Sequence, residues 1–217
     1  MPNSVPNIVI HRLPFYLRAL EMMAENGQVV TSSQELGDRL GISSAQIRKD
    51  LSHFGEFGKQ GTGYEVDYLR QQLRRILKIE ALWGIAIVGA GDLGHALVNY
   101  AGFRERNFLV ETVFDMDPKK VGTPIGSLKV EDQSQMLQRL KELDIKIAII
   151  AVPARNAQTV AELLIEGGVR AILNYAPITL NVPDEVCIEY IDPVIALQSM
   201  TYYLERESME QKRAVSE

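Results

Sequence analysis

The chain has 217 residues, of which 46% are hydrophobic and 24% are charged, so it can form one or two folded units with a substantial core. This composition excludes a chain that is disordered, collagen-like or coiled-coil throughout. One cysteine, Cys187, and three scattered histidines exclude an internal disulfide bond and a cysteine-based zinc site, so we expect no metal. Neither an apolar run of about 18 residues nor a signal peptide is found, and we expect a cytoplasmic protein with no membrane partner.

The charges are divided unevenly along the chain. Residues 1–82 hold 10 Lys and Arg against 9 Asp and Glu, whereas residues 83–217 hold 13 against 19. The N-terminal part is therefore the better candidate for contact with a polyanion, although solvated charged faces are more common than nucleic-acid sites. The spacing of the residues has to decide between these two interpretations.

Three helices are predicted in the first 55 residues. Apolar residues at helical spacing predict the first helix from about Ile8 to Asn26, and Gly27 ends it. Two capping boxes predict the starts of the second and third helices, and they are Ser32 with Glu35 and Ser43 with Gln46. Gly41 separates these helices, and a glycine-rich segment and a short predicted strand, Tyr64–Val66, follow them. This order of elements resembles a winged helix-turn-helix.

The outward face of the third helix suits DNA. Ile47, Leu51 and Phe54, at positions i, i+4 and i+7, predict its buried stripe, and a step of about 100° per residue then defines the opposite face. Lys and Arg can neutralise phosphate or bind guanine, Gln can pair with adenine, and small residues let a helix enter the major groove. The predicted DNA-binding residues are Ser44, Ala45, Gln46, Arg48, Lys49 and Ser52, with Lys59 and Gln60 in the glycine-rich wing. The alternative is an ordinary three-helix interaction module whose polar face is solvated.

A fourth helix is predicted after the wing. Residues 67–82 repeat apolar positions at helical spacing, with basic residues between them. We interpret this helix as a domain connector rather than a surface that follows phosphates. The N-terminal domain is accordingly predicted to comprise residues 1–80.

A glycine motif follows the next predicted strand. The apolar run Gly84–Gly89 predicts a strand, and a GxGxxG turn then leads into a helix predicted to extend through Tyr100. In such a turn the first glycine, Gly89, permits the tight bend, and Gly91 lets the backbone approach a pyrophosphate. Gly94 lets the helix pack closely on the strand, and the N-terminus of the helix attracts the phosphates.

An acidic residue then selects between nicotinamide cofactors. Asp115 ends the second predicted strand, 21 positions beyond Gly94, where a carboxylate can bind the hydroxyls of the adenosine ribose. This favours NADH and NAD⁺ over the phosphorylated cofactors. Lys119 and Lys120 keep NADP(H) open as the alternative, because cations can accept its 2′-phosphate.

Further alternation predicts a doubly wound parallel sheet over residues 81–191. The expected elements are a helix at 132–143, a strand at 145–152, a helix at 156–166 and strands at 168–174 and 186–191. Ligands bind beyond the carboxyl ends of such strands, so the segments after two of them either line a nicotinamide pocket or merely end their strands. The predicted cofactor-binding residues are Gly89, Ala90, Gly91, Asp92, Leu93, Gly94, Asp115, Ala151, Val152, Pro153, Asn174, Tyr175 and Pro177.

The remaining residues leave little room for catalysis. Only about 25 residues follow the last strand, too few to enclose a substrate, so we predict no catalytic residues and expect the cofactor to act as a signal. Val194, Leu197, Thr201 and Leu204 predict an amphipathic helix within residues 192–217. We expect this helix to support a homodimer, because two-fold dimers usually present DNA-reading helices.

Several motifs together resemble the Rex family of bacterial redox-sensing transcriptional repressors. The resemblance covers nearly the whole chain. It is carried by Arg12–Arg18, Ile47–Leu51, Phe54–Gly58, Gly61–Tyr64, Gly89–Gly94, Ala151–Ala154, Ile172–Pro177 and Leu180–Pro183. It implies a homodimer that binds an inverted-repeat operator in double-stranded DNA and releases it when NADH rises, with the C-terminal helix exchanged between subunits.

The resemblance also implies a set of switch residues. Asp192 would pair with Tyr100 in the NADH-bound form and with Arg18 in the DNA-bound form. Two departures from the family pattern bear on the sites: Gln60 stands where the wing often has arginine, and Pro193 where a larger apolar residue is more usual. The alternative function is an NAD- or CoA-binding enzyme subunit with an accessory N-terminal module, because this core also resembles CoA-binding domains.

Overall fold

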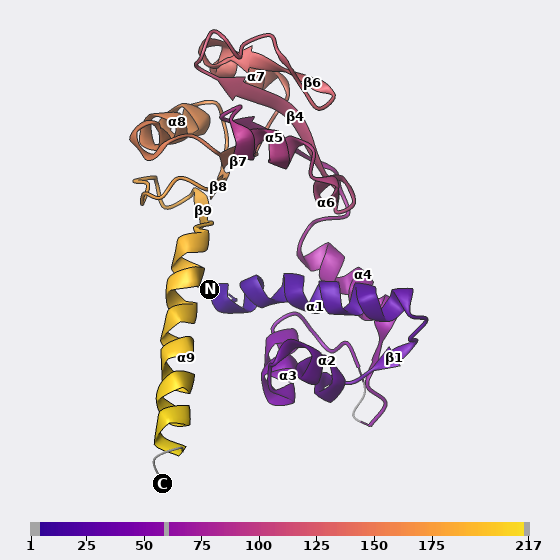
Figure 1. Cartoon of the computed structure of the whole chain (residues 1–217). Coiled ribbons are helices and arrows are strands. Elements are labelled where there is room, and N and C mark those ends of the chain that lie inside the picture. The colour runs from indigo at the N-terminus through magenta and orange to yellow at the C-terminus, as the bar shows by residue number, and fades with distance from the viewer. Residues whose placement is uncertain (1–4, 59–60, 215–217) are drawn as a thin grey trace. The chain divides into compact units, whose positions relative to one another are not determined.

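The computed structural model describes residues 5–58 and 61–214, with side chains described through Leu204 (Figure 1). The chain divides into two compact units, Met1–Ala81 and Leu82–Glu217. The first contains helices and a two-stranded sheet, and the second contains a seven-stranded sheet with helices.

The N-terminal unit has the element order of a winged helix-turn-helix. Its elements are α1 (Asn7–Glu25), β1 (Val30–Thr31), α2 (Ser33–Leu40), α3 (Ser44–Ser52), β2 (Tyr64–Glu65) and α4 (Val66–Ile76). The strands β1 and β2 pair antiparallel, which joins the segment before α2 to the segment after the wing. Apolar side chains from all four helices form one core, and they include Leu13, Leu20, Leu36, Ile47, Leu51, Leu69 and Leu73.

At the starts of α2 and α3, one of the two hydrogen bonds of each predicted capping box forms. Ser32 Oγ accepts the backbone N–H of Glu35 at 3.1 Å, and Ser43 Oγ accepts that of Gln46 at 3.2 Å. The side chains of Glu35 and Gln46 instead bond to other side chains, so the reciprocal half of each box was predicted wrongly. Gly41 ends α2 in the left-handed conformation, with φ of 66°.

The connector helix is shorter than predicted. α4 ends at Ile76, whereas its apolar spacing predicted a helix to residue 82. Lys78 adopts the left-handed conformation, with φ of 56°, and its N–H and that of Ile79 bond to the carbonyls of Arg75 and Arg74. These bonds satisfy the last turn of the helix and turn the chain, which periodicity alone does not reveal.

The second unit contains a doubly wound sheet. Its strands are β3 (Trp83–Val88), β4 (Phe108–Asp115), β5 (Pro124–Ile125), β6 (Leu128–Asp132), β7 (Ile147–Ile150), β8 (Ala171–Asn174) and β9 (Cys187–Tyr190). Their order is β5-β6-β4-β3-β7-β8-β9, and only the β5–β6 pair is antiparallel. The six parallel strands thus follow the 3-2-1-4-5-6 order of dinucleotide-binding folds, which confirms the predicted fold class.

The helices of this unit differ from the predicted ones most clearly in two places. They are α5 (Asp92–Val98), α6 (Ala101–Arg104), the 3₁₀ turn η1 (Gln133–Gln135), α7 (Met136–Glu142), α8 (Ala154–Glu166) and α9 (Pro193–Ala214). α5 ends at Val98, so Tyr100 is not on this helix but caps α6. The helix predicted at 132–143 begins only at Met136, because the preceding residues complete β6 and η1. Sequence periodicity missed both β5 and β6.

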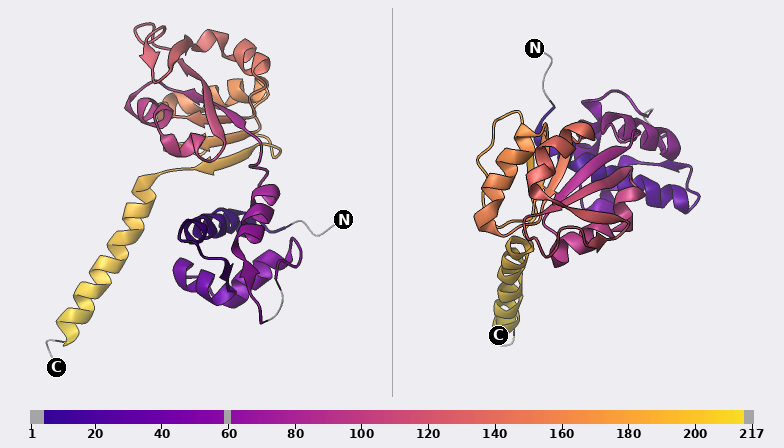
Figure 2. Two further views of the ribbon diagram at one scale, coloured as in Figure 1. Left: turned by 90° about the vertical axis from the view of Figure 1, so that its right-hand side faces the viewer. Right: turned by 90° about the horizontal axis from the view of Figure 1, so that it is seen from above.

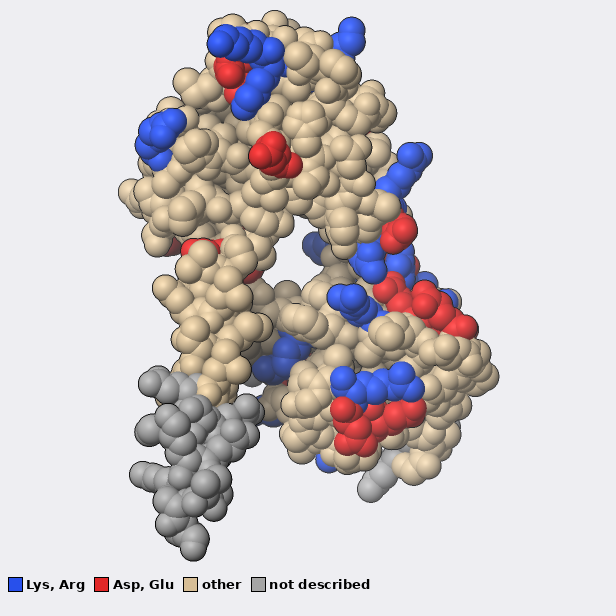
Figure 3. All heavy atoms as spheres, viewed as in Figure 1, with Lys and Arg blue, Asp and Glu red and all other residues tan. Residues whose placement is uncertain are grey.

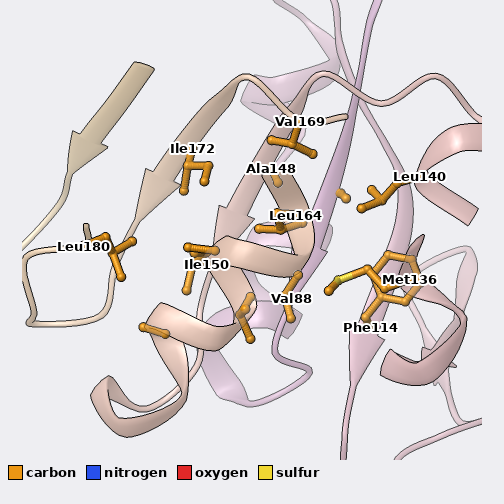
Figure 4. Close-up of a cluster of buried hydrophobic side chains, with 14 of the residues drawn as sticks. Val88, Phe114, Met136, Leu140, Ala148, Ile150, Leu164, Val169, Ile172 and Leu180 are labelled. Atoms are coloured by element: carbon orange, nitrogen blue, oxygen red, sulfur yellow. The ribbon is translucent and has the colours of Figure 1, made fainter. Parts of the chain in front are cut away.

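Both faces of the sheet are covered. Successive residues of a strand point to opposite faces, so Val88 packs in one apolar cluster and Ile87 in another. Figure 4 shows the first cluster, where Val88, Ala148 and Ile150 lie with Leu164 of α8 and Leu140 of α7. Apolar side chains cover both faces, so the ligand-binding positions of this sheet lie at the strand ends.

The first half of the C-terminal helix is apolar but exposed. Figure 2 shows α9 as one unbroken helix. Its first residue is Pro193, which suits the first turn because that position needs no N–H donor. The large apolar side chains described on it are all exposed, and they are Val194, Ile195, Leu197, Met200, Tyr202, Tyr203 and Leu204. Within the described residues, no helix is long and apolar enough to cross a membrane.

Candidate functional site

The face of α3 predicted to contact DNA is exposed. Ala45, Arg48, Lys49 and Ser52 are exposed, and Ser44 and Gln46 are half-buried. The opposite side of the helix is buried by Ile47 and Leu51, as the helical spacing predicted, whereas Phe54 lies beyond the end of α3 and is half-buried. Lys59 and Gln60 of the wing lie outside the described residues.

Charges of both signs lie close together on the N-terminal unit. Figure 3 shows Lys and Arg next to Asp and Glu on the viewed face of the N-terminal unit. Ion pairs join Arg39 to Glu35 at 3.5 Å and Arg70 to Asp67 at 2.9 Å. In such exposed pairs the two charges largely offset each other, so the predicted nucleic-acid interface depends on the particular side chains of α3.

Arg48 lies at the boundary between α3, α2 and the wing. Its Nη1 donates to Ser33 Oγ at 2.9 Å. It also lines a cavity of about 650 Å³, together with Ser32, Ser33, Gly58, Gly61, Gly63 and Tyr64. The guanidinium is therefore held toward the start of α2, while Lys49 extends from the exposed face of α3.

A buried carboxylate anchors α3 to α1. Asp50 is fully buried and accepts hydrogen bonds from Arg12 at 2.6 and 2.7 Å, from the Tyr16 hydroxyl at 2.6 Å and from the Gln46 amide at 2.7 Å. Burial by itself would raise the pKa of Asp50, but the hydrogen bonds from Arg12, Tyr16 and Gln46 outweigh it and lower the pKa. Burial and the bond to Asp50 raise the pKa of Tyr16. Asp50 is therefore a charged acceptor at neutral pH.

The glycine turn of the second unit has the geometry of a phosphate-binding loop. Gly89 has φ of 110°, which few L-residues adopt, and a Cβ there would collide with the carbonyl of Ala151. A Cβ at Gly94 would collide with the carbonyl of Gly89, so α5 packs directly on the turn. A Cβ at Gly91 would meet no atom within 4 Å. Gly91 therefore borders open space, where a ligand can approach the backbone.

Asp115 faces this turn. Its Oδ2 accepts the N–H of Ala90 at 2.8 Å and the ammonium of Lys120 at 3.0 Å, and its Oδ1 accepts the N–H of Asp117 at 2.9 Å. Burial opposes ionisation, but the bonds from Asp117, Lys120 and Ala90 together lower the pKa of Asp115. The ammonium group of Lys120 is therefore paired with the Asp115 carboxylate.

The turn opens on a cavity of about 460 Å³ at the carboxyl ends of β3, β4 and β7. Its lining residues are Gly89, Gly91, Asp92, Leu93, Asp115, Met116, Lys120, Gln133, Ala151, Val152, Pro153, Arg155 and Asn156. Eight of these were predicted from the sequence. The dimensions and the donor set fit part of a dinucleotide, because open backbone at Gly91 adjoins a carboxylate that can accept ribose hydroxyls.

The Asn174 side chain organises the segment at the end of β8. Asn174 is buried, and its amide bonds to the carbonyls of Ala176 and Ile178 and to the N–H of Ala176. These bonds occupy the side chain within its own loop. Asn174, Tyr175 and Pro177 are not among the described residues that line the cavity. Asn174 therefore shapes the loop, and direct contact between these three residues and a cofactor stays a prediction.

Known proteins resemble the chain over nearly its full length. Residues 4–52 match the family model "Putative DNA-binding protein N-terminus", and residues 80–178 match "CoA binding domain". A redox-sensing transcriptional repressor Rex of Chloroflexus aurantiacus is 53% identical over 202 residues, which cover 93% of this chain and 95% of that protein. The Rex repressor of Pelotomaculum thermopropionicum is 45% identical over 201 residues, with 93% and 94% covered. The chain belongs to the Rex family.

Solved structures of a Rex-family repressor, RSP, share its architecture. The structure of RSP with β-NAD⁺ and operator DNA has a TM-score of 0.90 and 37% identity, covering 97% of each chain. The structure of RSP with β-NADH has a TM-score of 0.88 and 35% identity, covering 97% of this chain and 99% of that chain. The family resemblance predicted from the motifs is thus confirmed. The enzyme-subunit alternative is wrong, because the relatives are transcriptional repressors.

The switch residues that the Rex family implies lie on three separate elements. Arg18 is exposed on α1. Tyr100 is 58% exposed and packs edge-on against Phe103, with ring centroids 5.2 Å apart. Asp192 accepts the N–H of Val194 at 2.9 Å, at the start of α9. Their mutual pairing stays a prediction.

Sequence reasoning missed two groups of residues in this Rex-family chain. Arg12, Tyr16 and Asp50 form the anchor of α3, and the available signal was an acidic residue next to the apolar stripe of a short helix. Met116, Gln133, Arg155 and Asn156 line the cavity. The signal for these was their place after β4, after β6 and in the first turn of α8.

Proposed function

We propose that this protein is a transcriptional repressor that senses the ratio of NADH to NAD⁺. It binds an inverted-repeat operator as a homodimer when NADH is scarce and releases it when NADH rises. One observation carries the proposal: a single chain combines an exposed, charged α3 with a glycine turn that opens on a cavity fitting part of a dinucleotide. Its Rex relatives are named redox-sensing repressors. The proposal includes a cytoplasmic location, where a bacterial operator would be reached.

In this proposal, the cofactor lies across the glycine turn. The backbone of Gly89–Gly94 and the first turn of α5 hold the pyrophosphate, and Asp115 accepts hydroxyls of the adenosine ribose. The carboxylate disfavours a 2′-phosphate, and its bond to Lys120 keeps that cation from attracting one. When bound, the nicotinamide supplies the redox signal through its two oxidation states.

The DNA contacts come from α3. Lys49 contacts base edges or phosphates in the major groove, and Arg48, held by Ser33, contacts the backbone beside the wing. Ala45 and Ser52 leave room for the helix to enter the groove. A solvated polar face is the weaker explanation, because the RSP relative was solved with operator DNA.

The dimer uses the C-terminal segment. Residues 192–217 form a third functional segment, because the large apolar side chains described on α9 are exposed. A second subunit would remove this apolar surface from water. The helix is exchanged between subunits, which brings Asp192 of one chain to the partner.

A titration of operator binding with each cofactor tests the function. The full-length protein would first select its operator from a random duplex library, and fluorescence anisotropy at fixed salt would then measure affinity. Saturating NADH should weaken binding by about tenfold, which corresponds to about 1.4 kcal/mol, and NAD⁺ should have much less effect. The Arg48→Ala, Lys49→Ala double variant should lose operator affinity while still binding NADH. Absence of an NADH effect on the wild type would refute the sensor.

A further inference from the structure

Gln46 is a half-buried side chain whose amide is already engaged. Its Nε2 donates to Asp50 Oδ1 at 2.7 Å, across one turn of α3. Gln46 lies beside Ala45 and Lys49, which are exposed on the face that the proposed function assigns to DNA. Its amide therefore belongs both to the anchor of α3 and to the edge of the DNA-reading face.

Asp50 permits only one orientation of that amide. The carboxylate is held by Arg12 and Tyr16 of α1, independently of any nucleic acid. An ionised carboxylate accepts hydrogen bonds and cannot donate, so the NH₂ group of Gln46 faces Asp50. The carbonyl Oε1 and one remaining N–H are then left for a partner outside the protein.

Resting on the proposed function, we propose that Asp50 orients Gln46 to read adenine rather than guanine in the operator. In the major groove, adenine offers its N6 amino group as a donor and N7 as an acceptor, which matches one acceptor and one donor on Gln46. Guanine offers two acceptors, O6 and N7, and the anchored amide has only one N–H left. Gln46 is thus a specificity-determining residue, and Asp50 is its positioning residue.

An exchange of Asp50 for asparagine should reverse this preference. Arg12 donates to both carboxylate oxygens, Nε to Oδ2 and Nη2 to Oδ1, so an asparagine NH₂ group would meet an Arg12 donor in either orientation. With the asparagine oxygen at the Oδ2 place, the bonds from Arg12 Nε and the Tyr16 hydroxyl are kept, and the NH₂ group faces Gln46, whose amide can turn to accept. Gln46 would then turn its carbonyl inward and present two N–H donors outward. That arrangement suits guanine, and a merely structural role of Asp50 would not reverse the base preference.

The structure contains a matched control. Gln34 Nε2 donates to Asp38 Oδ1 at 2.8 Å, which is the same pairing at the same spacing, but on α2 and exposed. Asp38→Asn alters a Gln–Asp pair of the same chemistry without touching α3. It should leave base preference unchanged.

The experiment measures base preference in the selected operator, one position at a time, by anisotropy with full-length protein. The position where Gln46→Ala abolishes the preference identifies the contact. There, wild type should prefer adenine to guanine by about five- to tenfold, and purine or 7-deazaadenine in place of adenine should weaken binding by a similar factor. Asp50→Asn should prefer guanine at this position, with circular dichroism verifying its fold. The salt dependence of binding should not change, because Gln46 is uncharged.

Three results would overturn the inference. They are a wild-type preference for guanine at this position, an adenine preference that persists in Asp50→Asn, and no position affected by Gln46→Ala. If Asp50→Asn does not fold, the base analogues with wild type and Gln46→Ala still decide the matter. Failure of the proposed function is distinguishable, because it would appear as loss of the NADH effect or of any selected operator.

Discussion

At the scale of single residues, the N-terminal unit depends on a buried charge. Asp50 is inaccessible to solvent, and Arg12 balances its charge in a two-bond pair while its own side chain is 20% exposed. A buried ion pair contributes little net stability, but removing one partner leaves an uncompensated charge. The pair therefore holds α3 against α1 in one arrangement more than it stabilises the fold.

Arg12→Ala should destabilise this unit in a pH-dependent way. At pH 7 we expect a loss of about 3 kcal/mol, because ionised Asp50 loses its counter-charge. The lowered folded-state pKa of Asp50 stabilises wild type above the unfolded-state pKa of about 3.9, and this contribution is lost as pH falls through the folded-state pKa. The difference in the free energy of unfolding between wild type and Arg12→Ala should therefore shrink below about pH 4.

Urea unfolding followed by circular dichroism between pH 7 and pH 3 measures this difference. Arg39→Ala, which removes an exposed ion pair with Glu35, is the control and should cost much less. If the loss of stability in Arg12→Ala stayed constant down to pH 3, Arg12 would not be compensating the charge of Asp50.

Asp115→Asn should relax the choice of cofactor. The neutral amide no longer repels a 2′-phosphate, and Lys120 is released from its 3.0 Å ion pair to attract one. We expect the preference for NADH over NADPH in calorimetry to fall by about tenfold, which corresponds to about 1.4 kcal/mol. Asp117→Asn, two residues away, is the control. Equal binding of both cofactors by wild type would show that Asp115 does not select.

At the scale of elements, the glycine turn joins β3 to α5 through two different constraints. Gly94 serves the packing of α5 on the turn, whereas Gly91 leaves a space that no atom of the described chain fills. Within one short motif, stability and ligand binding thus depend on separate glycines. Their separation makes each effect measurable alone.

Gly91→Ala and Gly94→Ala should have opposite signatures. Gly91 has φ of −88° and ψ of −169°, which alanine adopts without strain, so its variant should fold normally but bind NADH at least about tenfold more weakly. Gly94→Ala should lower the free energy of unfolding by about 1–3 kcal/mol, because its Cβ meets backbone. Thermal unfolding and calorimetry separate the two. Normal NADH affinity in Gly91→Ala would exclude close approach of the cofactor there.

At the scale of the whole molecule, sensing requires that ligand binding to one unit changes the ligand affinity of the other. The chain divides into an N-terminal unit with α3 and a second unit with the glycine turn. Coupling between DNA and NADH therefore requires elements that are arranged differently in the DNA-bound and NADH-bound forms. Because linkage is reciprocal, NADH must weaken operator binding by the same factor by which operator weakens NADH binding. Asp192, at the start of α9, is the residue that the family implies for this exchange.

Asp192→Ala should uncouple the two ligands. We expect NADH binding to stay largely intact, while the effect of NADH on operator affinity falls toward none from a coupling of about 1–3 kcal/mol. The measurement is operator affinity with and without saturating NADH, in both proteins. Asp184→Ala, in an exposed loop of the same unit, is the control. An unchanged ratio would remove Asp192 from the mechanism.

Local patterns in the sequence were enough to determine much of this protein. The exposed face of α3, the strand–turn–helix around Gly89 and the βα alternation follow from spacing, because each depends on neighbouring residues and on backbone sterics. The family motifs added the inverted-repeat operator, its release by NADH and the switch residues. Tertiary structure alone decided that Asp50 meets Arg12 and Tyr16, more than 30 residues away, and that β5 and β6 extend the sheet. Tertiary structure also decided that the Asn174 side chain bonds to the loop that follows it. Such contacts join distant parts of the chain, and no local period encodes them.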